Sequence, residues 1–194
     1  MIREAFSIRQ PGLSGGAIWV ALVATLVAAG ATAGTDAAPA LAACPKASVP
    51  ATELGPAALR RATTCRINHL RQSRGRDRVR SHPGLRRVAQ RHTRKMVETQ
   101  CLKHRCPGEK PLGRRIRQSG YLAGARRWKF AQNTGCAVTA KAMVRNWRQS
   151  KFHRRNMLRR RFEHIGTGGV PRATHRRCGD SMATFTALLA WRVP

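Results

Sequence analysis

The sequence predicts an α+β domain in which helices come first along the chain and a pair of antiparallel strands comes last. Apolar residues recur at helical spacing from residue 56 onwards, whereas residues 162–170 and 182–191 have the composition of two strands joined by a connection containing Pro, Gly and Cys. Because a helix and a sheet each bury an apolar face, this order favours helices layered on an antiparallel sheet. About 150 residues remain after an N-terminal leader, enough for one domain with its own core.

The first 43 residues resemble an export signal rather than part of the fold. Arg3 and Arg9 give a basic start, residues 17–33 are apolar and rich in small side chains, and small residues suited to cleavage occur over 33–43. This order is typical of a cleaved secretory signal peptide, and the apolar run is short for a membrane span. We expect a secreted monomer without a transmembrane anchor after cleavage. The alternative is a bacterial lipoprotein signal that leaves a lipid on Cys44.

An irregular Pro- and Ala-rich segment over residues 44–56 precedes the predicted elements. These are a helix over 56–74 that ends at Gly75, a helix capped by Ser81 with Pro83 in its first turn, a loop over 101–108, a short helix over 112–118, a strand over 125–133, a helix capped by Thr139 and the two C-terminal strands. The second helix carries His92 on its apolar stripe, so we interpret His92 as a core histidine rather than a ligand.

All six cysteines follow the leader. An even number in an exported chain favours disulfides, although their count alone leaves many pairings open. We predict the pairs Cys44–Cys65, Cys101–Cys106 and Cys136–Cys178. The alternative is a zinc site, since Cys101, His104 and Cys106 are close enough in sequence to supply three ligands.

The charge of the chain is extreme: 38 Lys and Arg stand against 8 Asp and Glu, a formal net charge of +30, and 31 of the basic residues are arginine. Such a surface attracts polyanions, whether nucleic acid, anionic lipid or the phosphate and carboxylate polymers of a cell wall. Export and the small number of aromatic residues leave nucleic acid as a non-specific partner only. The alternative to polyanion binding is that arginine is abundant for compositional reasons alone and that its charges simply keep the surface solvated.

Six segments, in order along the chain, carry a resemblance to a known family: CRINHLRQSRG, LRRVAQRHTRKM, KHRCPGEKPLGRRIRQSGY, AQN, MVRNWRQSKFHRRNML and FEHIGTG. They resemble the CAP superfamily of cysteine-rich secretory, antigen 5 and pathogenesis-related proteins, and in particular its bacterial SCP-like extracellular members. We assign the domain to residues 57–194. The resemblance implies a three-layer α-β-α sandwich around a central antiparallel sheet, with a cleft that collects histidines and acids.

The resemblance also implies which residues line the cleft. His104 matches the family's H-x-x-P pattern and His153 its S-x-x-H-R pattern, and two neutral imidazoles can bind Zn²⁺ or simply hydrogen-bond across a packed cleft. The acids of the family are missing. Gln132 replaces the Glu of the family's Gly-Glu-Asn pattern. Ser150 occupies the position of the second acid of eukaryotic members, and His164 the position of a Glu common in bacterial members. An amide cannot accept a proton at neutral pH.

We therefore predict a non-catalytic binding module for anionic cell-envelope or extracellular ligands. One alternative is a zinc-dependent hydrolase acting through His104 and His153, with Glu98 or Glu163 supplying the carboxylate. Ser150 beside His153 suggests a nucleophile and its base, but no third member is identifiable. Another alternative is a lipid-binding or membrane-active protein, although the basic residues are spread along the chain rather than gathered on one amphipathic face.

Overall fold

The computed structural model describes residues 43–174 and 178–194, and the predicted signal peptide lies outside them, apart from residue 43. Its elements are, in chain order, η1 (Ala51–Glu53), α1 (Pro56–Gln72), β1 (Arg80–Ser81), α2 (Pro83–Glu98), α3 (Leu112–Gln118), β2 (Arg127–Ala137), α4 (Ala140–Gln149), α5 (Lys151–Leu158), β3 (His164–Val170) and β4 (Ala183–Val193). Within this part of the chain, no helix combines the length and the apolar character needed to span a membrane.

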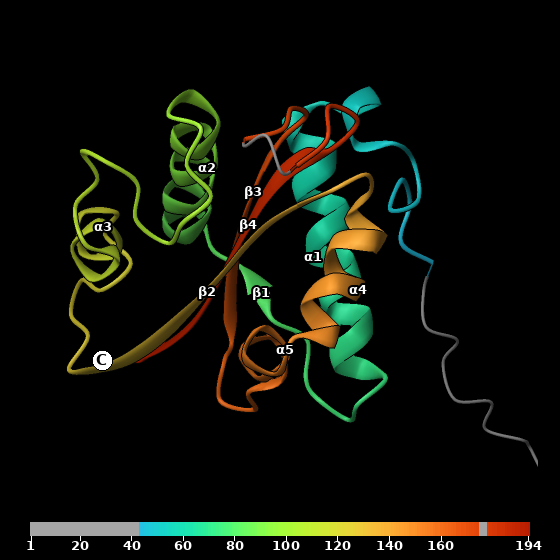
Figure 1. The fold of residues 1–194 in the computed structure, drawn as a ribbon. Helices are drawn as coiled ribbons and strands as arrows, with labels where there is room; N and C mark the ends of the chain where they lie inside the picture. The colour runs from blue at the N-terminus through green and yellow to red at the C-terminus, as the bar shows by residue number, and fades with distance from the viewer. Residues whose placement is uncertain (1–42, 175–177) are drawn as a thin grey trace, which may run out of the picture. The chain divides into compact units, whose positions relative to one another are not determined.

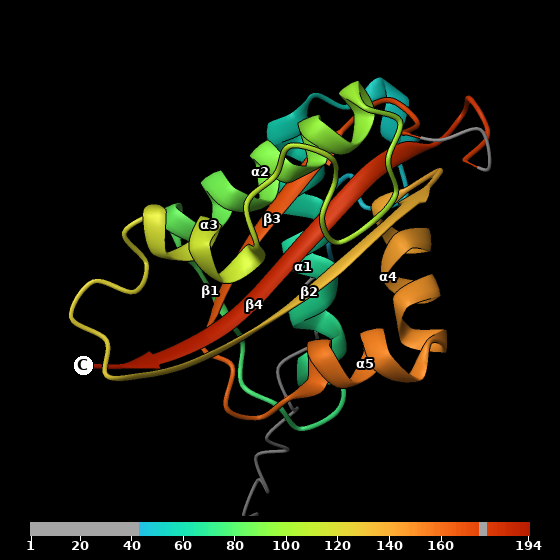
Figure 2. The same cartoon turned by 60° about the vertical axis from the view of Figure 1, so that its left-hand side comes forward.

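The strands form one sheet of order β1-β3-β4-β2. Helices α2 and α3 lie on one face, and α1, α4 and α5 on the other (Figures 1 and 2). The predicted three-layer α+β fold is thus confirmed. The sheet is mixed rather than wholly antiparallel: β4 pairs antiparallel with β2 and β3, but β1 pairs parallel with β3. A two-residue strand leaves no periodic signal in the sequence, so β1 was not predicted.

The core lies on both faces of β4. Phe185, Ala187 and Leu189 pack with the α1, α4 and α5 layer, while Leu188 and Ala190 pack with α2 and α3. All five side chains are fully buried. A central strand covered on both faces explains why residues 187–191 of β4 are all apolar instead of alternating.

One predicted helix cap is wrong. The side chain of His82, not Ser81, caps α2: its Nδ1 accepts a hydrogen bond from the Gly84 N–H at 3.1 Å. Ser81 is held in β1, where it pairs with Ile165. In addition, residues 151–158 form a separate helix, α5, within a segment to which no element was assigned.

All three predicted disulfides are present, with Cα–Cα distances of 5.6, 5.8 and 5.9 Å that suit such bonds. The bond from Cys44 to Cys65 fastens the N-terminal segment to α1. That segment belongs to the core, since Ala51 is fully buried and its N–H donates to the Val138 carbonyl at 2.8 Å. Because the Cys44 sulfur is bonded to Cys65, it is not free to carry a lipid.

Candidate functional site at the β2 edge of the sheet

Strand β2 is an edge strand, and two adjacent residues on it hold the two sides of the candidate cleft. Gln132 and Asn133 are 6% and 0% exposed. Because successive side chains of a strand point to opposite faces, Gln132 lies on the face of α2 and α3, paired with Leu188, and Asn133 on the face of α4 and α5, paired with Ala187. The groups that contact Gln132 and Asn133 therefore lie on opposite faces of the sheet at its β2 edge.

His104 reaches this edge from the loop closed by the Cys101–Cys106 disulfide. The His104 Nδ1 lies 3.2 Å from the Oε1 of Gln132. With the amide oxygen as acceptor, the Nδ1–H of His104 donates this hydrogen bond. The Nε2 of Gln132 is buried and has no hydrogen-bond partner in the described part of the chain.

His153 approaches the same edge from α5, on the other face of the sheet. The side-chain amide of Asn133 donates to the His153 carbonyl at 3.1 Å, and its oxygen accepts from Asn156 at 2.9 Å, so Asn133 fixes α5 to β2. Burial, and secondly the nearby charge of His104, lower the pKa of His153. His104 therefore acts electrostatically on His153, and the lowered pKa leaves His153 neutral at pH 7.

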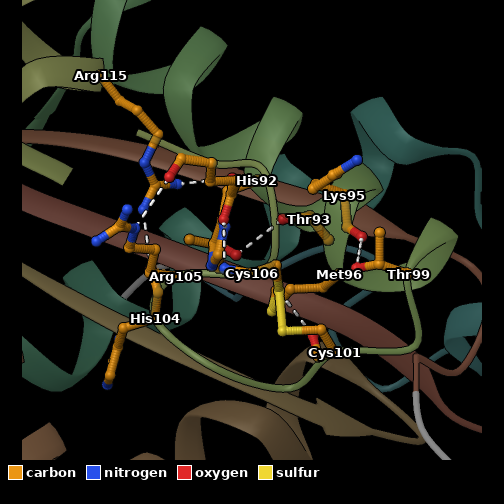
Figure 3. Close-up of polar contacts among 12 residues, drawn as sticks. His92, Thr93, Lys95, Met96, Thr99, Cys101, His104, Arg105, Cys106 and Arg115 are labelled. Carbon is orange, nitrogen blue, oxygen red and sulfur yellow. Dashed lines mark hydrogen bonds and ion pairs between the residues drawn. A yellow bond between two sulfur atoms is a disulfide. The ribbon is translucent and has the colours of Figure 1, made fainter. Parts of the chain in front are cut away.

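A buried carboxylate holds the loop that carries His104. Glu109 lies 2.8 Å from His92 Nδ1, accepts from the Cys106 N–H at 2.9 Å and pairs with Arg115 at 2.9 Å. Arg115 also donates to the His104 carbonyl at 2.8 Å. Figure 3 shows the His104 side chain turned away from His92 and Arg115. Glu109 thus shapes the loop and is already engaged by three donors, which leaves it unsuited to act as a general base in the cleft.

His92 is fully buried and bonded to Glu109, as expected of a core histidine. Burial lowers the pKa of His92, although Glu109 opposes the shift. Sequence reasoning missed Glu109 as its partner. The signal that was available is the scarcity of acids in this chain, because a lone carboxylate among so many cations is expected to be structurally engaged.

The structure does not bring every predicted site residue to the β2 edge of the sheet. Ser150 ends α4 and begins α5, and its side chain makes no capping bond. His164 lies at the start of β3, separated from β2 by β4, a spacing of about 10 Å. There His164 Nδ1 contacts the Tyr121 hydroxyl at 3.2 Å, and His82 packs edge-on against both rings.

Burial governs the chemistry of this second cluster, formed by His82, Tyr121 and His164. Burial raises the pKa of Tyr121 to about 12, so its hydroxyl stays neutral and can donate to His164. Burial also lowers the pKa of both histidines, and the charge of Arg192 lowers them further. The structure thus places His164 in a packed, uncharged cluster that fastens β3 to the loop after α3.

The donors around the cleft do not complete a zinc shell. Within residues 43–174 and 178–194, no group of three or more His, Cys, Asp or Glu is placed to hold a metal ion. Cys101 and Cys106 are bonded to each other, which rules out their zinc site with His104. Glu163 lies beside His164 and acts on the pKa of that ring. Two imidazoles and an amide remain, and stable zinc sites require three or four stronger ligands.

Restoring one carboxylate is expected to create the zinc site that the cleft lacks. We predict that Gln132→Glu binds Zn²⁺ about 10- to 100-fold more tightly than the unchanged protein at pH 7.5, because a carboxylate beside His104 orients the imidazole and adds negative charge. Isothermal titration calorimetry measures the Zn²⁺ affinity of both proteins. The control is Gln132→Glu combined with His104→Ala and His153→Ala, which should lose the gain. Equal affinity of the unchanged protein and Gln132→Glu would contradict the prediction.

Comparison with known proteins agrees with the fold described above. The model of the cysteine-rich secretory protein family, CAP, matches residues 65–185, more than half of the chain. No curated protein matches the chain.

Two solved structures share the fold. An extracellular protein containing an SCP domain from Bacillus anthracis is 17% identical, with a TM-score of 0.54 over 70% of this chain and 43% of that one. An outer surface protein from Borrelia burgdorferi is 19% identical, with a TM-score of 0.52 over 67% of this chain and 90% of its own. The present chain therefore spans less than half of the Bacillus protein, and at these identities the likeness shows the fold alone.

Proposed function

Because the chain belongs to the cysteine-rich secretory protein (CAP) family, we propose that it is an exported, non-catalytic module that binds anionic polymers of the cell envelope or extracellular space. Its three disulfides suit an oxidising compartment outside the cytoplasm. The two similar structures come from proteins described as extracellular and as an outer surface protein, which supports the same location.

The observation that carries this proposal is a large positive charge that the protein itself does not neutralise. The formal net charge is +30. Among the residues that the structure describes, the ion pairs number two, and both use Glu109. Arg115 is thus the one arginine of this part that is paired with an acid. Unpaired guanidinium groups are free to bind the phosphates or carboxylates of a polyanion, and this binding releases condensed counterions from the polymer.

The cleft supports binding better than catalysis. A hydrolase needs a base or a metal-bound water, and a nucleophile needs an oriented partner. Here the residue beside His104 is the amide of Gln132, at 3.2 Å, and the nearest carboxylate of the loop is bonded to His92 and Arg115. What the cleft offers is a set of hydrogen-bonding groups without negative charge, which suits an anionic or neutral ligand.

Salt dependence tests the proposal. We expect binding to poly(glycerol phosphate), a linear phosphodiester polymer of the teichoic-acid type, to weaken at least about a hundredfold between 50 and 500 mM NaCl, since each phosphate contact releases counterions. Fluorescence anisotropy with a labelled polymer measures the affinity, and uncharged dextran serves as the control polymer. Binding that is absent, or that does not respond to salt, would refute the proposal.

A further inference from the structure

The sheet has a second edge, at β3, on the side away from β2. Strand β1 pairs only with His164 and Ile165, so within residues 43–174 and 178–194 the rest of β3 has no neighbouring strand on that side. Helices α1 and α2 lie on opposite faces of β3 (Figure 1). An added Cβ at Gly169 would meet Leu59 of α1, and one at Gly168 would meet Ala89 of α2. Both helices therefore pack closely against β3, and residues 165–169 of the strand are buried between them.

Two adjoining pockets follow the β3 edge, with volumes of about 330 and 390 Å³, and they share Arg60 and Arg86. Thr64 and Thr167 line the first pocket, and Gln90 lines the second. We call the two pockets together the arginine groove, after the side chains that dominate their walls: Arg60, Arg61, Arg78, Arg86, Arg87, Arg91 and Arg94.

The charges of the groove are uncompensated. Neither pocket is lined by an acidic residue. Helix α1 contains no Asp or Glu, and α2 contains only Glu98, its last residue. Burial lowers the pKa of Arg60, and the neighbouring arginines, Arg86 first, lower it further. Cations held close together in this way repel one another, and a bound anion would remove that repulsion.

The groove is also preorganised. Gln90, which is 8% exposed, donates to the Gly169 carbonyl at 3.0 Å and accepts from the Gly169 N–H at 3.1 Å. The same Gln90 oxygen accepts from Arg60 at 3.1 Å, which fixes that guanidinium. The hydroxyls of Thr64 and Thr167 lie 3.0 Å apart, and Thr167 also donates to the Arg60 carbonyl at 3.1 Å. Fixed side chains lose less entropy on binding than the mobile arginines of a flat basic face.

We propose that the arginine groove binds successive phosphates of a linear phosphodiester polymer; this inference rests on the polyanion-binding function proposed above. Guanidinium groups match phosphate oxygens with paired hydrogen bonds. Two pockets that share Arg60 and Arg86 offer adjacent positions for two anions of one chain. Neither pocket is lined by an aromatic residue on which bases could stack, which disfavours nucleic acid.

Two variants with the same net charge test the groove. The groove variant carries Arg→Gln at four lining positions: Arg60, Arg61, Arg86 and Arg91. The control variant carries Arg→Gln at four exposed positions that line neither pocket: Arg114, Arg126, Arg127 and Arg160.

At 150 mM NaCl we expect the groove variant to bind poly(glycerol phosphate) about a hundredfold more weakly than the unchanged protein, and the control variant no more than about threefold more weakly. The slope of log affinity against log salt should fall by roughly 3 in the groove variant, one phosphate contact for each arginine lost. Without polymer, the melting temperature of the groove variant should equal or exceed that of the unchanged protein, because repulsion is relieved; this verifies that the variant folds.

The possible failures are distinguishable. Equal losses in the two variants would overturn the groove while leaving the polyanion-binding function in place. No binding by the unchanged protein at any salt concentration would overturn both. If the groove variant keeps its affinity for the polymer but loses binding to phosphatidylglycerol vesicles, the groove meets a membrane surface and the proposal is wrong.

Discussion

Replacing Arg71 by methionine is expected to lower the free energy of unfolding by about 3–5 kcal/mol, the loss typical of removing a buried, multiply bonded cation. Arg71 is fully buried in α1. Its guanidinium donates to four main-chain carbonyls: those of Asp77 at 2.7 Å, Met157 at 2.7 Å, Arg159 at 3.1 Å and Phe162 at 3.1 Å. Methionine fills part of the volume but leaves these acceptors without a donor.

The position of those carbonyls explains why the effect should be large. They belong to the turn after α1, the last turn of α5 and the segment that leads into β3, where the main chain leaves regular structure. One side chain therefore supplies the bonds that the main chain there does not make for itself. Because α5 carries His153, loosening this end of the helix also shifts one wall of the cleft.

Urea denaturation followed by circular dichroism measures the loss. The matched control is Arg61→Met, the same chemical change on the same helix at an exposed position, expected to alter stability by less than about 0.5 kcal/mol. Arg71→Lys should fall between the two, because an ammonium group has too few donors for four separated carbonyls. If Arg71→Met costs no more than Arg61→Met, the guanidinium does not hold these segments together.

The features that the sequence predicted well are those with a local signal. Helix α1 follows from apolar residues at helical spacing and a glycine after its end, and β4 from a long apolar run near the C-terminus. That the cysteines form disulfides followed from their even number in an exported chain. In each case the determining residues lie close together in the sequence or belong to one residue type.

The features that escaped prediction depend on contacts between distant segments. His82 caps α2 because β1, two residues long, fixes the main chain just before it. The bond from Glu109 to His92 joins a loop to a helix 17 residues away. A family pattern assigned His164 to the cleft by its place in the sequence, whereas its contacts depend on which strand and which face it occupies.

The arginine groove shows the same limit for charge. Sequence counting finds arginines throughout the chain and cannot rank one against another. Only the fold brings Arg60 of α1 to Gln90 of α2 and sets both over the open edge of β3 at Gly169. A surplus of charge indicates a class of ligand, and the positions at which charges are buried and held indicate where that ligand binds.

The glycines of β3 lead to the second large effect: Gly166→Ala is expected to destabilise the domain by about 3 kcal/mol or more, at the upper end for an overpacked core. A Cβ at residue 166 would overlap the main-chain atoms of Leu85 and Arg86 in the first turn of α2. No side-chain rotation can relieve a clash with main chain, so α2 as a whole must move away from the sheet.

A graded series separates this cause from a general effect of alanine in a strand. At Gly169 the added Cβ would lie 2.7 Å from one atom of α1, the Cβ of Leu59, whereas at residue 166 it would come within 2.5 Å of three main-chain atoms of α2, so Gly169→Ala should cost less than Gly166→Ala. At Gly179 an added Cβ would have no described atom within 4 Å apart from its chain neighbours, and Gly179→Ala should cost less than about 0.5 kcal/mol. Denaturation midpoints that do not follow the order 166, 169, 179 would show that α2 does not lie against β3 as closely as described.

If the order holds, Gly166→Ala should also weaken binding of the phosphodiester polymer without changing the charge, since moving α2 carries Arg86 and Gln90 away from the β3 edge.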